Sequence, residues 1–233
     1  MEAILKEGFG ELGLRLPEGS AERFNAYFEF LDEHSKLMNL TAISGKEDTA
    51  KLHFLDCAAL LCFHSFENKR VIDVGSGAGF PGLPLKIISP GMKLSLLDSQ
   101  KKRVDFLESL CAHLGYGDID CLWLRAEEAP PEMREDFDIA LSRAVARLNI
   151  LAELCLPFVK VGGVFLAMKG PDPAAEIDEA HSAFEKLGGQ LQNIFEYTIP
   201  GSDVRHTVIA VKKIKHTPST YPRRYAKIQK SPL

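Results

Sequence analysis

The sequence feature that most constrains the fold is an apolar, β-branched run that ends in a glycine-rich turn. Residues 71–74 read VIDV and residues 75–82 read GSGAGFPG. A continuous apolar run is typical of a strand that is buried on both faces of a parallel sheet. The turn then lies at the carboxyl end of that strand, where open α/β sheets bind small molecules.

Strand-like and helix-like runs alternate after this turn. Further strands are predicted to begin at Lys93, Ile119, Phe137 and Val161, with helices over 84–88, 101–113, 149–159 and 173–187. Two β-rich runs, 191–199 and 204–213, follow and predict an antiparallel hairpin at one edge. Alternation of this kind predicts an α/β fold with a doubly wound, mostly parallel sheet.

The remaining segments complete a predicted single domain over residues 1–233. Apolar residues at helical spacing predict helices over 20–38 and 46–63, which belong to an N-terminal helical extension, 1–66. The α/β core is expected over 67–214. The proline-containing tail, 215–233, is expected to be irregular.

Charge is distributed unevenly along the chain. The formal net charge is −4, yet no acidic residue follows Asp203. The basic residues beyond it are Arg205, Lys212, Lys213, Lys215, Arg223, Arg224, Lys227 and Lys230. A basic end on an acidic body indicates a polyanionic partner, with a merely solvated tail as the alternative.

Nothing in the sequence predicts a membrane segment, a secretory signal or a metal site. The longest apolar run, 161–168, is far shorter than the roughly 20 residues that span a bilayer. The N-terminus lacks a basic start with an apolar stretch, so a cytoplasmic protein is expected. The five cysteines form no CxxC pair, which favours buried, reduced thiols over zinc ligands.

The glycine turn indicates a nucleotide-like ligand without identifying it. Gly75, Gly77 and Gly79 form GxGxG, and with Gly82 the spacing GxGxxG of a dinucleotide-binding dehydrogenase is also satisfied. Asp73 argues for S-adenosylmethionine, because a carboxylate would repel a pyrophosphate but complements a sulfonium and an ammonium. No Lys-Ser or Lys-Thr pair follows the turn, which excludes a P-loop.

Carboxylates after the next two strands extend this candidate site. Asp98, followed by Ser99, ends the second strand, where an acceptor bridges both ribose hydroxyls of either cofactor. After the third strand, the Ala126 amide and the Glu127 carboxylate are expected to hold the adenine. A solvated loop acid is the alternative for Glu127.

Several longer motifs resemble those of one family. They are NLTAI at Asn39, HFLDC at His53, VIDVGSGAGFPGLPL at Val71, LLDSQKKRVDFL at Leu96, RAEE at Arg125, SRAVA at Ser142 and TPSTYPRRYAKIQKSPL at Thr217. Over nearly its whole length the chain resembles the RsmG family, also called GidB. It departs from the family pattern at Cys57, where serine is common, and at 225–228, YAKI, where a small residue, glycine and often proline follow YPRR.

The resemblance implies a class I S-adenosylmethionine-dependent methyltransferase fold, Rossmann-like, with methyl transfer to N7 of a guanine in small-subunit (16S) ribosomal RNA. It also implies that Gly75, Phe80, Ala126, Glu127 and Arg143 contact the cofactor. Asp98 is a further candidate cofactor contact, because of its place at a strand end. The partner is expected to be unpaired or bulged RNA, free or within a ribosomal particle, bound by a monomer.

Two arginines are candidates for catalysis. Arg143 and Arg125 follow the fourth and third predicted strands. Guanine N7 carries an unprotonated lone pair, so no general base is required. An arginine bidentate to O6 and N7 would block that lone pair, so Arg143 is expected to contact O6, a phosphate or the cofactor. For both arginines a surface ion pair is the alternative.

Five basic residues are expected to neutralise RNA phosphates. They are Lys169, Arg205, Arg223, Arg224 and Lys230. His53 and Asn39 belong to motifs, but their roles do not follow from the residues; helix packing for His53 and a turn at Asn39 are the simplest interpretations. A dehydrogenase, a non-catalytic RNA-binding protein and a methyltransferase with a small-molecule or protein substrate remain as alternatives.

Overall fold

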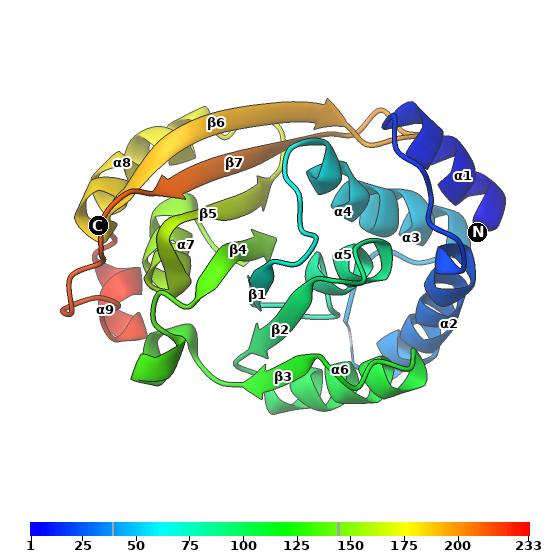
Figure 1. The fold of residues 1–233 in the computed structure, drawn as a ribbon, viewed down its shortest axis with the longest axis horizontal. Helices are drawn as coiled ribbons and strands as arrows, with labels where there is room; N and C mark the ends of the chain where they lie inside the picture. Colours follow the sequence, from blue (N-terminus) through cyan, green and yellow to red (C-terminus); the bar gives the residue numbers. More distant parts are fainter. Residues whose placement is uncertain (39, 144) are drawn as a thin grey trace.

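The computed structural model describes residues 1–38, 40–143 and 145–233. Within them, seven strands form one sheet in the order β3-β2-β1-β4-β5-β7-β6 (Figure 1). The strands are β1 (Arg70–Val74), β2 (Lys93–Asp98), β3 (Asp120–Trp123), β4 (Phe137–Arg143), β5 (Val159–Lys169), β6 (Gly189–Thr198) and β7 (Arg205–Lys213). The first five are parallel and β7 is antiparallel to both its neighbours, which confirms the predicted fold and its edge hairpin.

Helices cover both faces of this sheet (Figure 1). They are α1 (Glu2–Glu11), α2 (Ser20–Met38), α3 (Lys46–Thr49), α4 (Asp56–Ala58), α5 (Gly82–Ile88), α6 (Lys101–His113), α7 (Leu148–Cys155), α8 (Ala174–Leu187) and α9 (Tyr225–Lys230). Short 3-10 turns are η2 (Ala59–Cys62), η3 (Ala126–Glu128), η4 (Pro131–Met133) and η5 (Leu156–Phe158). Among the described residues no helix is long and apolar enough to cross a membrane.

The predicted helix over 46–63 is not continuous. A π-helical segment, η1 (Ala50–Leu55), separates α3 from α4. Such bulges are frequent at functional sites because they redirect side chains within a helix. His53 lies in η1 and Asp56 begins α4. The π-helical segment therefore sets the positions of the two polar residues of the HFLD motif.

Alternate residues of the parallel strands enter two separate cores. Val71 of β1 packs in one core with the N-terminal helices, whereas Ile72 and Val74 pack in the other with α7 and α8. The helical extension also touches the glycine turn directly, because the buried Tyr27 hydroxyl of α2 donates to the Ala78 carbonyl at 2.6 Å. The extension therefore supports the ligand-binding edge of the sheet.

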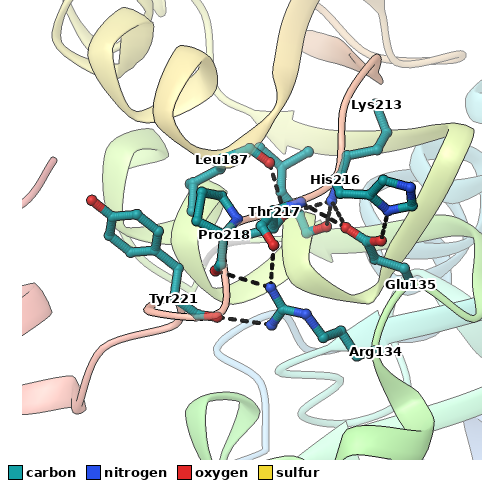
Figure 2. Close-up of polar contacts among 9 residues, drawn as sticks. Arg134, Glu135, Leu187, Lys213, His216, Thr217, Pro218 and Tyr221 are labelled. Carbon is teal, nitrogen blue, oxygen red and sulfur yellow. Dashed lines mark hydrogen bonds and ion pairs between the residues drawn. The ribbon is translucent and has the colours of Figure 1, made fainter.

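The C-terminal tail has no regular secondary structure over residues 215–224, as expected, but hydrogen bonds hold it in an ordered path, and it ends in a helix that the sequence did not predict. Figure 2 shows Arg134 and Glu135 gathered around Thr217: Arg134 donates to the carbonyls of Thr217, Pro218 and Tyr221, and Glu135 accepts the Thr217 amide at 2.7 Å. Periodicity cannot detect this order, because polar side chains of another segment hold the tail.

Beyond this anchor the chain forms α9, whose Ile228 is fully buried in the core that contains α7. The atypical sequence at 225–228 thus supplies the first turn of a short helix.

Candidate active site

A cavity of about 460 Å³ opens at the carboxyl edge of the parallel strands. Six of the residues predicted to bind the cofactor line it: Gly75, Gly77, Phe80, Asp98, Ser99 and Arg143. His53 and Arg103 also line it. The carboxyl ends of β1, β2 and β4 thus meet around one space, as expected for a topological switch point.

Two glycines of the turn are required by backbone conformation and by space. Gly75 has φ +78°, and a Cβ there would lie 2.5 Å from Val145 Cγ2. Gly79 has φ +101°, and a Cβ there would lie 2.6 Å from the Tyr27 hydroxyl. A side chain at either position would strain the turn and displace its neighbours.

Asp73 lies behind the turn rather than on the cavity surface. It is fully buried, and its Oδ2 accepts the Gly82 amide at 2.8 Å, at the start of α5. Among the described residues Oδ1 has no hydrogen-bond partner. Burial raises the pKa of Asp73 to about 7, despite the Gly82 amide and the Arg143 charge, which lower it. An unsatisfied buried carboxylate oxygen next to the turn favours a cationic ligand nearby.

Asp98 shapes the turn from the neighbouring strand. Its Oδ2 accepts the Gly77 amide at 3.0 Å and its Oδ1 accepts the Gln100 amide at 2.9 Å. Arg103 NH1 lies 3.5 Å from Oδ2. A carboxylate oxygen can accept more than one hydrogen bond. The Asp98 carboxylate can therefore still accept the predicted hydrogen bonds from the ribose hydroxyls.

Arg143 is held rigidly at the cavity rim. Its guanidinium donates to Asp56 Oδ2 at 3.0 Å and to His53 Nδ1 at 2.8 Å, and lies 4.8 Å from the centre of the Phe80 ring. Only 14% of the side chain is exposed. The surface ion pair considered from the sequence is therefore wrong for Arg143, because its partners are buried and it lines the cavity.

Asp56 is the centre of this network. It is fully buried, and its Oδ1 accepts the Tyr197 hydroxyl at 2.7 Å and lies 2.8 Å from His206 Nδ1. Burial alone would raise the pKa of Asp56, but the contacts with His206, Arg143 and Tyr197 outweigh it and lower the pKa below its usual value. A carboxylate that remains ionised neutralises Arg143.

His53 orients Arg143 without carrying charge. Burial, and then the nearby Arg143 charge, lower the pKa of His53 to about 3. A neutral ring that accepts from Arg143 at Nδ1 carries its proton on Nε2, which lies 2.8 Å from Thr41 Oγ1. His53 also stacks on Phe80, with ring centres 4.2 Å apart. Asn39, the other motif residue of unknown role, lies outside the described residues.

The candidates that follow β3 do not line the cavity. They are the catalytic candidate Arg125 and the predicted adenine contacts Ala126 and Glu127. Arg125 is 51% exposed and its NH1 is 3.8 Å from Glu127 Oε1. The Glu127 side chain is only 7% exposed, so it is not a solvated loop acid. Ala126 lines a second cavity of about 340 Å³ with Tyr221 and Pro222 of the tail.

The five predicted phosphate contacts divide into two groups. Arg205, Arg224 and Lys230 are exposed. Lys169 donates to Ala146 O and Glu176, both at 2.7 Å, and Arg223 is bidentate to the buried Glu153. The structure therefore places Lys169 and Arg223 in internal contacts rather than on the surface that was expected to meet RNA.

Sequence reasoning missed the partners that hold Arg143. Asp56, Tyr197 and His206 come from α4, β6 and β7 and meet only in the folded chain. The spacing of His53 and Asp56 in HFLD was the one available signal, since it puts two polar side chains in an otherwise apolar segment.

The residues around the cavity fit S-adenosylmethionine better than a dinucleotide. The glycine turn and Asp98 suit a nucleoside, and Asp73, which is buried behind the turn with an unpartnered Oδ1, favours a positive charge nearby rather than a pyrophosphate. The cavity also lies within the 300 to 1,000 Å³ range that is typical of small-molecule sites. Fold and site together define a class I S-adenosylmethionine-dependent methyltransferase.

Comparisons with solved structures agree with a methyltransferase fold. A methyltransferase described as S-adenosylmethionine dependent, from Aquifex aeolicus, superposes with a TM-score of 0.53 at 20% identity, over 71% of this chain and 93% of its own. TYW2 of M. jannaschii, solved in complex with AdoMet, superposes with a TM-score of 0.56 at 16% identity, over 74% and 80%. At these identities the likeness concerns the fold.

The sequence comparisons identify the family. Residues 20–206 match the GidB model, described as rRNA small subunit methyltransferase G. The "Ribosomal RNA small subunit methyltransferase G" of Alkaliphilus oremlandii is 45% identical, over 100% of this chain and 99% of the relative. The chain belongs to the rRNA small subunit methyltransferase G family, and the dehydrogenase alternative is thereby wrong.

The raised pKa of Asp73 predicts a pH dependence of cofactor binding. Below pH 7 the buried carboxyl holds a proton that a nearby cation would expel, so affinity is expected to rise with pH up to tenfold per unit and to level off above 7. Calorimetric titration with S-adenosylhomocysteine, which keeps the ammonium group, from about pH 6 to about pH 8 tests this. Asp73→Asn should flatten the profile; a flat profile for the unmodified protein would contradict it.

Proposed function

We propose that this protein transfers a methyl group from S-adenosylmethionine to N7 of a guanine in 16S ribosomal RNA. Family membership supplies the substrate class. The structural observation that carries the proposal is Arg143, fixed between Asp56 and His53 above Phe80 in the same cavity as the glycine turn. A cation held rigidly at that rim can orient an electron-rich base or an anionic group.

The protonation state of the site agrees with a reaction that needs no general base. Among the described residues, His53 is the one histidine that lines the cavity, and its low pKa keeps it neutral, with Nδ1 accepting from Arg143. Neither ring nitrogen is placed to remove a substrate proton. Attack by N7 requires no such removal, because the lone pair is already free.

The residues of the site align the guanine with the methyl group of the cofactor. When bound, S-adenosylmethionine supplies an electrophilic methyl group on a sulfonium. Arg143 contacts guanine O6, a phosphate or a carboxylate and leaves N7 open, since a bidentate contact would block the nucleophile. Phe80 and His53 stack on each other at the wall of the cavity, beside Arg143. Orientation of this kind lowers a barrier by roughly 7 to 11 kcal/mol.

RNA would approach from the edge that carries the cavity. Arg205 begins β7, which runs antiparallel to β5, with Thr207 opposite Lys169, so this exposed arginine lies at the carboxyl edge of the parallel strands. Arg224 and Lys230 add exposed charge on α9. We propose that these three residues neutralise phosphates of unpaired RNA, free or in a ribosomal particle, and that a cytoplasmic monomer suffices.

Transfer of labelled methyl from S-adenosylmethionine to unmodified small ribosomal subunits tests the proposal, with the labelled nucleotide then mapped. Label is expected on one guanine N7. Arg143→Ala should lower the rate about a hundredfold, as for loss of an electrostatic contact in a site. Arg147→Ala, an exposed arginine paired with Glu179, is the matched control and should keep the activity. Absence of label on subunits and on protein-free RNA would overturn the proposal that the substrate is ribosomal RNA.

A further inference from the structure

The only tryptophan of the chain is exposed next to the cavity. Trp123 ends β3, the edge strand of the sheet, and is 62% exposed. Large aromatic side chains stabilise a protein mainly when buried, so most of this indole surface is left free to contact a ligand. Its Nε1 donates to Ser99 O at 3.1 Å, and Ser99 lines the cavity. The ring is thus fixed at the cavity rim.

One basic residue, Lys101, packs against this indole, and three more lie near it along the chain or at the cavity. Lys101 Nζ lies 5.8 Å from the ring centre and pairs with Asp105 at 2.7 Å while staying 59% exposed. Lys102 is exposed, and Arg103 lines the cavity. Arg125, half exposed, follows two residues after Trp123. We call Trp123 with these four cations the Trp123 face.

An exposed aromatic ring among cations is the chemistry that holds single-stranded nucleic acid. Bases stack on aromatic faces regardless of sequence, while Lys and Arg neutralise the backbone. The Trp123 face adjoins the cavity through Ser99 and Arg103, so a strand whose target base enters the cavity would pass over it.

We propose that a base flanking the methylated nucleotide stacks on Trp123, so that the Trp123 face holds the unpaired strand beside the cavity. This inference rests on the proposed RNA substrate. It assigns RNA positioning to Trp123, a residue that does not itself line the cavity.

Because Trp123 is the only tryptophan, its fluorescence reports on this face alone. Titration with a single-stranded oligoadenylate of about ten nucleotides is expected to quench the emission at low salt. Trp123→Leu should weaken binding, measured by anisotropy of labelled RNA, about tenfold, and Trp123→Phe should restore most of it. Ile194→Ala, an exposed apolar residue on β6, is the matched control and should bind normally.

Unchanged emission on RNA binding, equal affinity of the Leu variant, or no RNA binding would each overturn the inference. Thermal unfolding of the Leu variant shows whether it is folded, and the Phe variant distinguishes stacking from a packing defect. Methyl transfer to small subunits is measured in parallel. Transfer without quenching would refute the Trp123 face alone, whereas absent transfer would refute the proposed function.

Discussion

Replacement of Asp56 by alanine is expected to lower the free energy of unfolding by about 3 to 5 kcal/mol, as for other buried ion pairs that lose one partner. Asp56 is fully buried and holds Arg143, Tyr197 and His206 together. Without it the Arg143 guanidinium, only 14% exposed, keeps its charge with no counterion. Urea denaturation of the two proteins under matched conditions measures the difference.

Two further variants make this prediction specific. Glu47→Ala removes an exposed carboxylate that pairs with Lys51 at 2.6 Å, and should leave the free energy of unfolding nearly unchanged, because water screens this pair. The double variant Asp56→Ala, Arg143→Met removes the charge together with its counterion. It should be less destabilised than the sum of the single variants; simple additivity would mean that the pair does not interact.

The parallel sheet was predictable because its strands are buried on both faces. Such strands leave continuous apolar runs, and those beginning near Arg70, Lys93 and Phe137 occur where the sequence indicated. Helix α6 begins and ends at the predicted residues, since its apolar positions follow a regular helical period. Local sequence patterns therefore sufficed to predict the parallel strands and helix α6.

The site was only partly predictable, because its decisive contacts join distant residues. Glycines and strand-end acids follow from local pattern, and Gly75, Gly77 and Asp98 line the cavity. Gly79, Asp73 and Glu127 do not. The hydrogen bond between Asp56 and Tyr197 and the contact between Asp56 and His206 join helix α4 to the edge hairpin, and no periodicity reports such a pairing. The π-helical segment that orients His53 likewise leaves no signature in the pattern of apolar residues.

Two neighbouring arginines show most clearly that a local pattern does not predict contacts between distant residues. Arg223 and Arg224 are equivalent in the sequence, and both were expected to bind phosphate. In the structure Arg224 is exposed, whereas Arg223 donates from its amide, Nε and NH2 to the fully buried Glu153 of α7. Charge identifies a basic segment, but only the fold decides which cation remains at the surface.

Arg223→Ala is accordingly expected to lower the free energy of unfolding by about 3 to 5 kcal/mol, because it leaves the Glu153 carboxylate buried without its guanidinium. Arg224→Ala is the matched control, with an expected change within about 0.5 kcal/mol and weaker, less salt-dependent RNA binding. Urea denaturation and RNA titration at two salt concentrations separate the two roles. The double variant Arg223→Met, Glu153→Leu should regain most of the lost stability, since it removes both charges. Equal effects of the two single variants on stability would contradict an anchoring role for Arg223 and return it to the RNA surface.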